Sequence, residues 1–502
     1  MPNYLSPGVY VEEVEAGSRP IEGVGTAVAA FVGLAAQGPF HTPTLVNNWS
    51  QYTNAFGEFV EDYYLAHAVY GYFLNGGGAC YVVRVGGAPS AGVAIPALPS
   101  GVMGRYRLVA RAADNHLAVE VADPAEGTPE DRFTLIVKAN GGEAERFENL
   151  TTKRGRDNVV TAVSERSRLI TVELADATSA PPRPASGTVE LRVAQQAPTP
   201  LVADEYAGDA AQRTGFGGLE AIDDITMVAC PDLMSGFEKG SLDAEAVKTV
   251  QLAMIAHCEL MGDRVAILDP LPGMSAQQVK EWRMEKAGYD SKYATLYYPW
   301  IKVFDAAIGT NRFVPPSGHM AGVWARNDST RGVHKAPANE VVRGAVEPQT
   351  QLIRSEQELL NPIGVNCIRA FPGRGVRVWG ARTLSSDPAW RYVNVRRLFN
   401  YLEESILGGT QWVVFEPNDH ALWARIRRTI AAFLVNEWRR GALFGLTPDE
   451  AFYVKCDDET NPAESIDAGL VVCEIGVAPV KPAEFVVFRL AQISGGTSLV
   501  SE

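Results

Sequence analysis

Cysteine is scarce in this sequence, and long apolar runs are absent. The 502 residues include six cysteines, and no two of them form a CxxC pair. Because free cysteine behaves as a small apolar residue, we expect reduced core cysteines and no disulfide. The six positions are Cys80, Cys230, Cys258, Cys367, Cys456 and Cys473.

No stretch reaches the roughly 18 consecutive apolar residues that a membrane-spanning helix needs. Residues 1–19 also lack the order of a cleaved export signal, a charged start followed by an apolar run. We therefore expect a protein that is assembled in the cytoplasm and does not insert directly into a membrane.

The motifs of common enzyme sites are missing as well. The sequence has no GxGxxG, no Walker phosphate loop, no GxSxG and no HExxH, and its seven histidines never pair at metal-binding spacing. His257, Cys258 and Glu259 are adjacent in a predicted helix, where neighbouring side chains point about 100° apart and do not share a metal. We expect no catalytic residue, no cofactor and no metal.

Asp232 and Asp269 are the best candidates for a catalytic site. Each lies beside the end of a predicted strand, in the contexts Pro231-Asp232 and Asp269-Pro270. The carboxyl ends of parallel strands are where open α/β sheets place ligand groups. An α/β enzyme with a β-rich accessory domain is therefore one alternative, although such dipeptides are also ordinary turns. A static shell protein is another.

Strand and helix patterns alternate in two separate parts of the sequence, 27–85 and 206–362, and together predict one α/β middle domain with a parallel sheet. The stretch 86–205 has proline-rich borders and short strand patterns, which predict an inserted β-sandwich or small barrel. In the second part of the middle domain, strands are predicted over 222–230, 264–268 and 293–303, and helices over 242–261 and 276–287.

The region 363–478 is predicted to be a C-terminal α+β domain, in which a helix separates strands over 376–383 and 412–415. The expected fold class is thus a mixed α/β multidomain protein. It has an α/β core, an inserted β-sandwich-like domain and this C-terminal domain, which is extended by strand arms at both chain ends.

The arms are predicted over 1–26 and 479–502. A strand that adds to the open edge of a neighbour's sheet gains a ladder of backbone hydrogen bonds. The alternative is that both arms fold onto sheets of their own chain. The arm strands contain Val9, Tyr10, Val11 and Glu12 at one end and Glu484, Phe485, Val486, Val487, Phe488 and Arg489 at the other; the hinge candidates are Gly17, Gly23, Gly25, Pro479 and Pro482.

Charge is unevenly distributed. The formal net charge of −14 argues against a nucleic-acid partner. Arg369–Arg440 nevertheless contains 12 arginines and 6 acidic residues, which leaves 33 basic and 53 acidic residues elsewhere. Within it, the helix predicted over 421–440 carries Arg425, Arg427 and Arg428 beside an apolar face. These arginines are either a surface for an acidic partner or the solvated side of a core helix.

Several long segments resemble the sheath proteins of contractile phage tails and of phage-tail-like injection systems. They are PGVYVEEV (7–14), VWARNDSTRGVHKAPAN (323–339), GVNCIRAFPGRGVRVWGARTL (364–384), RYVNVRRLFNYLEESI (391–406) and QWVVFEPND (411–419).

This resemblance implies a structural subunit that polymerises with itself as stacked rings of six around an inner tube protein. The rings are held by baseplate and tail-terminator proteins, and the sheath shortens to drive the tube through a target envelope. It further implies that the two arms join sheets of adjacent subunits while the bodies rotate about the linkers. The C-terminal domain faces the tube, with Arg425, Arg427 and Arg428 as candidate contacts.

Overall fold

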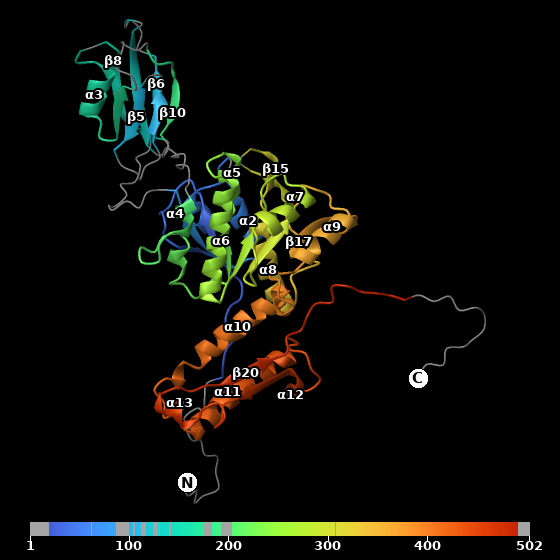
Figure 1. The fold of residues 1–502 in the computed structure, drawn as a ribbon. Coiled ribbons are helices and arrows are strands. Elements are labelled where there is room, and N and C mark those ends of the chain that lie inside the picture. Colours follow the sequence, from blue (N-terminus) through green and yellow to red (C-terminus); the bar gives the residue numbers. More distant parts are fainter. Residues whose placement is uncertain are drawn as a thin grey trace, which may run out of the picture. The chain divides into compact units, whose positions relative to one another are not determined.

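The structure is a computed structural model of the chain (Figure 1). The chain divides into two compact units, Ala88–Ala197 and the remainder, which joins Met1–Gly87 to Pro198–Glu502. The residues that the structure describes are 20–61, 63–86, 100–103, 106–111, 117–123, 129, 131–139, 142–153, 155–174, 183–191, 203–306 and 308–489.

An eight-stranded sheet forms the centre of the larger unit, in the order β18-β17-β13-β12-β11-β1-β3-β2. All neighbours from β3 to β17 are parallel, and β2 and β18 close the two edges in antiparallel pairing. The strands are β1 Val28–Gly33, β2 Thr44–Val46, β3 Ala79–Arg84, β11 Met227–Ala229, β12 Val265–Leu268, β13 Ala294–Tyr298, β17 Val365–Phe371 and β18 Gly375–Val378.

Every residue of β11, β12 and β13 is buried, as expected for parallel strands covered on both faces. Figure 1 shows α2, α6 and α8 around this sheet. The helices of this region are α1 Trp49–Phe56, α2 Leu65–Asn75, α4 Ala203–Ala207, α5 Asp232–Glu238, α6 Ala244–Met261, α7 Ala276–Glu281, α8 Ser317–Arg331 and α9 Arg354–Leu360, with the short turns η1 Gly217–Leu219, η2 Trp282–Lys286, η3 Asn361–Ile363 and η4 Pro388–Trp390.

A small antiparallel sheet, in the order β15-β14-β16, follows β13. Its strands are β14 Ile301–Asp305, β15 Thr310–Val314 and β16 Glu347–Pro348. The strand predicted over 293–303 is therefore two strands in different sheets. Pro299 lies between them, and proline cannot donate the hydrogen bond that a continuous ladder would need.

The smaller unit consists of two antiparallel sheets, β10-β6-β7-β8 and β4-β5-β9, that bury one common apolar core. Leu108 from one sheet and Val119 and Leu135 from the other are completely buried in it. The elements are β4 Ser100–Met103, β5 Tyr106–Ala110, β6 Leu117–Ala122, β7 Arg132–Ala139, β8 Gly142–Thr151, α3 Val159–Arg166, β9 Ile170–Leu174 and β10 Gly187–Glu190.

The C-terminal part of the larger unit has a core of its own, built from α10, α11 and the two-stranded sheet β19-β20. The Asp419 side chain accepts the Leu422 amide and thereby starts α11 at His420. The elements are α10 Val393–Gly409, η5 Gln411–Val413, α11 His420–Arg439, α12 Pro448–Ala451, β19 Phe452–Lys455, α13 Ala463–Asp467 and β20 Glu474–Val477.

The predicted mixed α/β class is confirmed. Of the predicted C-terminal strands, one is wrong and one is too long. Residues 412–415 do not form a strand, because the chain turns through η5 directly after α10 and leaves Phe415 fully exposed in a left-handed conformation. The strand predicted over 376–383 ends at Val378 and pairs back with β17 as a hairpin. No helix in the described ranges is both long and apolar enough to cross a bilayer.

Candidate assembly site

The linker that precedes β1 lies along α10. Ile21 is buried in the C-terminal core, and the Val24 amide donates to Ser405 Oγ at 3.2 Å. A Cβ added to Gly23 would overlap the Tyr401 hydroxyl, whereas one at Gly25 would meet nothing within 4 Å. Of the two predicted hinge glycines in this segment, Gly23 thus serves close packing and Gly25 lies in open space.

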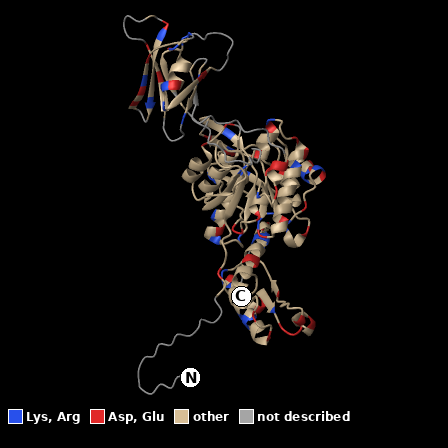
Figure 2. Ribbon diagram, turned by 90° about the vertical axis from the view of Figure 1, so that its left-hand side faces the viewer, with Lys and Arg blue, Asp and Glu red and all other residues tan. Residues whose placement is uncertain are grey.

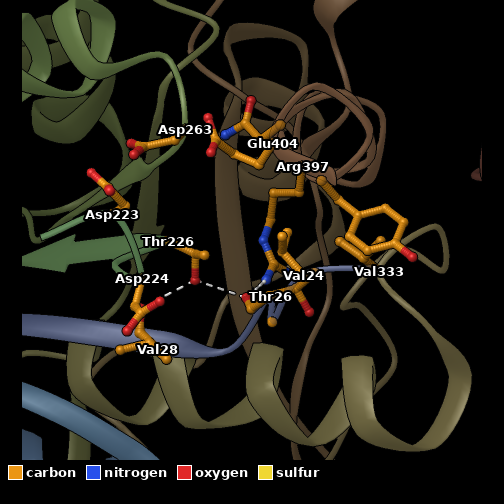
Figure 3. Close-up of a pocket in the computed structure, with 13 residues that line it drawn as sticks. Val24, Thr26, Val28, Asp223, Asp224, Thr226, Asp263, Val333, Arg397 and Glu404 are labelled. Carbon is orange, nitrogen blue, oxygen red and sulfur yellow. Dashed lines mark hydrogen bonds between the residues drawn. The ribbon is translucent and has the colours of Figure 1, made fainter. Parts of the chain in front are cut away.

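The linker ends in a buried cluster that we call the N-terminal clasp, made of Thr26, Asp328 and Arg397. Thr26 and Arg397 of this clasp are labelled in Figure 3. Arg397 Nη2 lies 2.6 Å from Asp328 Oδ2, and the two side chains are 3% and 4% exposed. Thr26 Oγ1 donates to the same carboxylate at 2.7 Å, and the Thr26 carbonyl accepts from Arg397 at 2.8 Å. The clasp therefore joins the linker to α8 and α10 together.

A cavity of about 160 Å³ adjoins the clasp and has Asp223, Asp224, Asp263 and Glu404 on its wall. Burial raises the pKa of Glu404, and the nearby carboxylates of Asp263 and Asp223 raise it further. The described residues contain no group of three or more side chains able to hold a metal ion. The cavity lies between the linker, α10 and the segments that carry Asp223 and Asp263.

The enzyme candidates Asp232 and Asp269 have structural partners. Asp232 accepts the Leu34 and Tyr64 amides at 2.7 and 2.5 Å, and Asp269 accepts the amide and hydroxyl of Ser317 at 2.9 and 2.5 Å. Both carboxylates are buried, and burial raises their pKa values to about 6 and about 7. Their oxygens cap loops and helix starts around the sheet, which is the ordinary role of a buried, hydrogen-bonded carboxylate.

After β20 the chain first stays attached to its own C-terminal core. The Ala478 carbonyl accepts the Phe444 amide at 2.7 Å, and the Val480 amide donates to the Ala442 carbonyl at 3.2 Å. The Val480 carbonyl in turn accepts from the Asn394 side chain at 3.1 Å. The predicted hinge residue Pro479 is therefore held on both sides.

A second fixed point, the C-terminal clasp, holds Glu484. Arg382 Nε and Nη2 meet its two carboxylate oxygens at 2.9 and 2.5 Å. Asn361 Nδ2 and the Tyr392 hydroxyl donate to the same group at 2.8 and 3.1 Å. Burial alone would raise the pKa of Glu484, but the hydrogen bonds from Arg382 and Asn361 outweigh it and the pKa is lowered. Glu484 is thus bound within its own chain.

The residues directly after this clasp are exposed and apolar. Among the described residues, ten large apolar side chains are more than 60% exposed, and eight of them follow residue 410. Apart from an isolated bridge between Pro479 and Leu443, the described part of the C-terminal arm, up to Arg489, pairs with no described strand. Val9, Tyr10, Val11, Glu12 and Gly17 lie outside the described residues. The eight exposed side chains are Val414, Phe415, Phe444, Leu446, Phe485, Val486, Val487 and Phe488.

The three arginines proposed as tube contacts have different surroundings. Arg425 pairs with Glu416 at 2.9 Å and lies over the Trp412 ring, and Arg427 donates to the Cys456 carbonyl. Only Arg428 is exposed, and its side chain has no ion pair within the described chain. Figure 2 shows acidic and basic residues interspersed on the ribbon of this domain. Much of the local excess of arginine is thus neutralised internally.

Sequence reasoning did not identify the clasp residues Asp328, Arg382 and Arg397. All three lie in segments that carry the resemblance, but that resemblance gave no pairing. Arg382 and Glu484 are 102 positions apart, so no local pattern connects them.

Comparisons with known proteins agree with this architecture. A model of the phage tail sheath protein central domain matches residues 215–384, and one of the phage tail sheath C-terminal domain matches 385–493. The tail sheath protein of Burkholderia phage BcepMu is 26% identical over 93% of this chain and 92% of its own length. That of Vibrio phage KVP40 is 26% identical over 45% of this chain and 35% of its own length.

Two solved structures share the fold over almost the whole chain. The sheath complex of the extracellular contractile injection system PVC, in the contracted state, gives a TM-score of 0.61 at 24% identity, over 98% of this chain and 99% of that one. The contracted helical sheath of the anti-feeding prophage gives 0.60 at 24% identity, over 97% and 99%. The matched sheath domains and relatives define a structural protein of contractile tails, which is not an enzyme. The chain belongs to the phage tail sheath family.

Proposed function

We propose that this chain is the repeating subunit of a contractile sheath that stacks as six-membered rings around an inner tube. Shortening of the sheath drives the tube through a target envelope. The contracted sheaths of PVC and of the anti-feeding prophage match the chain from end to end, which supports this role. The finer domain division follows the same scheme: arms at 1–26 and 479–502, a middle domain at 27–85 and 206–362, an insertion at 86–205 and a C-terminal domain at 363–478.

One observation carries the proposal: an exposed apolar segment follows a C-terminal sheet that has two strands among the described residues. In β19-β20, each strand has one edge with no partner among the described residues. A two-stranded sheet needs packing against a helix or further strands to be stable. Here α11 covers one face, and the two open edges can still accept further strands. Phe485–Phe488 is apolar at four consecutive positions and exposed, so these side chains would be buried if the segment became a strand of a receiving sheet that is covered on both faces.

The geometry favours donation of the arm to a neighbouring copy. Glu484 is fixed to its own chain at Arg382, and the residues beyond it are exposed. Each backbone hydrogen bond in the receiving sheet would contribute about 0.5–1.5 kcal/mol net. Two arms per subunit, the second containing Val9–Glu12, would link every copy to several neighbours and make the lattice multivalent.

Contraction of the sheath requires that the same subunits pack against one another in two different arrangements. In this scheme the chain segments outside the two clasps absorb the change, because Ile21–Thr26 and Ala478–Glu484 are fixed to the body. No nucleotide is consumed. The partners are further copies of the chain, the tube protein, and baseplate and terminator proteins. Assembly takes place in the cytoplasm, followed by release of the particle on lysis.

The test is production of the full chain and of a chain that ends at Glu484, each imaged by negative-stain electron microscopy. We expect hollow tubes from the full chain and folded, unassembled protein from the shortened one. A chain that ends at Ile493 lacks only the polar tail and serves as the control, and it should still form tubes. Tubes from the chain ending at Glu484 would contradict the arm mechanism. Closed shells or small discrete oligomers from the full chain would contradict the sheath.

A further inference from the structure

Two cysteines lie opposite each other at the open end of the β19-β20 ladder. The antiparallel register runs from Phe452 opposite Val477 to Lys455 opposite Glu474. One step further along both strands, the next opposed pair is Cys456 and Cys473. Both thiols are free, and they are close enough to hydrogen bond to each other.

Their position in the ladder is of the kind that brings side chains close. The Ala478 amide donates to the Ala451 carbonyl, so this opposed pair is hydrogen-bonded. Hydrogen-bonded and non-hydrogen-bonded pairs alternate along an antiparallel ladder, which makes Cys456 and Cys473 a non-hydrogen-bonded pair. The Cys456 carbonyl accordingly points outward and accepts from Arg427. In such pairs the Cα atoms are about 4.5 Å apart, within the range that a disulfide spans.

The two thiols differ in access. Cys456 is completely buried in the C-terminal core, and Cys473 is half-buried at its edge. Burial raises the pKa of the Cys473 thiol to about 12, with Cys456 as the next contributor. Both are therefore protonated at neutral pH and react slowly. Cys80 and Cys367 lie in the central sheet opposite other residue types, namely Ala29, Val46 and Tyr298.

We propose that Cys456 and Cys473 form a redox-controlled modification site that closes as a cross-strand disulfide in the presence of a low-molecular-weight disulfide. The Cys473 thiolate attacks one sulfur of that oxidant and expels the first thiolate, leaving a mixed disulfide on Cys473. The Cys456 thiolate then attacks Cys473 Sγ and expels the second. Two electrons pass to the small disulfide, which leaves as two thiols carrying the two cysteine protons.

The bond would fasten the end of a sheet that has only two strands of its own. Reducing conditions inside a cell keep the pair as thiols, and oxidising conditions outside favour the bond. Its role in the lattice rests on the proposed function, because only a released sheath leaves the cytoplasm. The disulfide would then hold β19 and β20 together while the arms of neighbouring copies exert force on the outer edges of these two strands. Formation of the bond itself does not depend on assembly.

The test uses unassembled full-length protein, incubated for hours with glutathione disulfide at about pH 8.5, because the raised thiol pKa values leave few thiolates to start the exchange. Free thiols are then alkylated, and the digest is analysed by mass spectrometry. We expect one cross-linked peptide pair containing Cys456 and Cys473, which disappears on treatment with dithiothreitol. The variant Cys473→Ser should lose the pair, and Cys367→Ser should keep it. Because Cys473 lies at the edge of the core and is only partly buried, its replacement by serine should leave the fold intact.

A second readout is the melting temperature, which should rise on oxidation in the unaltered chain and stay unchanged in Cys473→Ser. A lasting glutathione adduct on Cys473 with Cys456 still free would overturn the proposal. A bond from either cysteine to another position would overturn it as well. Tube formation is a separate measurement. A chain that forms no tubes would count against the proposed function and not against the disulfide.

Discussion

The two clasps hold the same C-terminal region to the same α/β body, but they do so in different environments. In the N-terminal clasp the charged side chains of Arg397 and Asp328 are 3% and 4% exposed, and a carbonyl and a hydroxyl of Thr26 complete their hydrogen bonds. In the C-terminal clasp Arg382 and Glu484 are 9% and 19% exposed. A buried pair is costly to break and insensitive to salt, whereas a partly exposed pair is weaker and responds to solvent.

Because of this difference, we expect the two clasps to have different structural roles. The N-terminal clasp fixes the relation of α8 to α10 within the larger unit. The C-terminal clasp fixes only the point where the apolar arm leaves the body. Variants of each clasp should separate these roles, with effects on stability at the first and on the arm at the second.

The largest effect is expected for Arg397→Met. It leaves the Asp328 carboxylate buried without its counter-ion, which costs about 3–5 kcal/mol. The measurement is urea unfolding followed by tryptophan fluorescence, since Trp324 lies beside the Arg397 guanidinium. The midpoint should fall sharply and should change little between low and high salt.

The matched control is the double variant Arg397→Met with Asp328→Leu, which replaces the pair by apolar groups. Because no lone charge then remains buried, most of the lost stability should return. A single variant as stable as the unaltered chain would show that the pair is not the fixed point described here.

The second effect compares the two glycines of the linker. Gly23→Ala places a methyl group where the Tyr401 hydroxyl lies, and overpacking of this kind costs about 1–3 kcal/mol. Gly25→Ala meets open space and should stay within about 0.5 kcal/mol of the unaltered chain. Hydrogen exchange of the amides from Ile21 to Thr26 should accelerate in the first variant only. Equal behaviour of the two would mean that the linker does not pack against α10.

A smaller effect is expected for Glu484→Gln, which removes the charge that Arg382 binds and costs about 1.5 kcal/mol. Chymotrypsin should then cleave faster at Phe485 and Phe488, because the start of the arm is released. The exposed carboxylate of Glu464 on α13 provides the control variant Glu464→Gln, which should leave the cleavage rate unchanged. Cleavage as slow as in the unaltered chain would argue against the C-terminal clasp.

The same clasp has a defined pH dependence. The pKa of Glu484 is lowered in the folded chain, so its contribution is complete above the ordinary glutamate pKa of about 4.3. It is lost as the pH falls through the lower folded value. Release of the arm should therefore be constant from neutral pH down to about 5 and should rise only in stronger acid. It is measured with an acid-active protease, whose rate at each pH is corrected by its rate on an unfolded peptide of the arm sequence. In the variant Glu484→Gln, release of the arm should not rise further as the pH falls, because the titrating carboxylate is gone.

Local patterns in the sequence predicted the elements that local chemistry determines. The buried strand β12 and the amphipathic helix α6 lie close to their predicted ranges, because apolar periodicity and capping specify them. The run Trp412–Phe415 was misread because four apolar residues carry no period that separates a strand from an exposed turn. The α/β core follows from the alternation of such elements, so its class could be predicted.

The candidate site could be predicted only in part. Its apolar arm is visible as a sequence run, but the clasps pair residues 69 and 102 positions apart, and single-sequence periodicity contains no information on such pairs. Likewise the arginines from 369 to 440 predicted a basic surface, whereas the structure uses Arg382, Arg397 and Arg425 in ion pairs of its own chain. Charge counts cannot distinguish a free cation from a paired one.

The smallest effect is expected at Arg428, the exposed one of the three predicted tube contacts. Arg428→Glu should lower the salt concentration at which tube protein separates from co-assembled sheath, since exposed charge pairs are weak and screened by salt. The control Arg166→Glu makes the same charge change on an exposed position of α3 in the other unit and should have no effect. If both variants release the tube at the same salt concentration as the unaltered chain, Arg428 does not face the tube. The contact would then rest on the exposed apolar residues of the same domain, because the other two arginines are already bound within the chain.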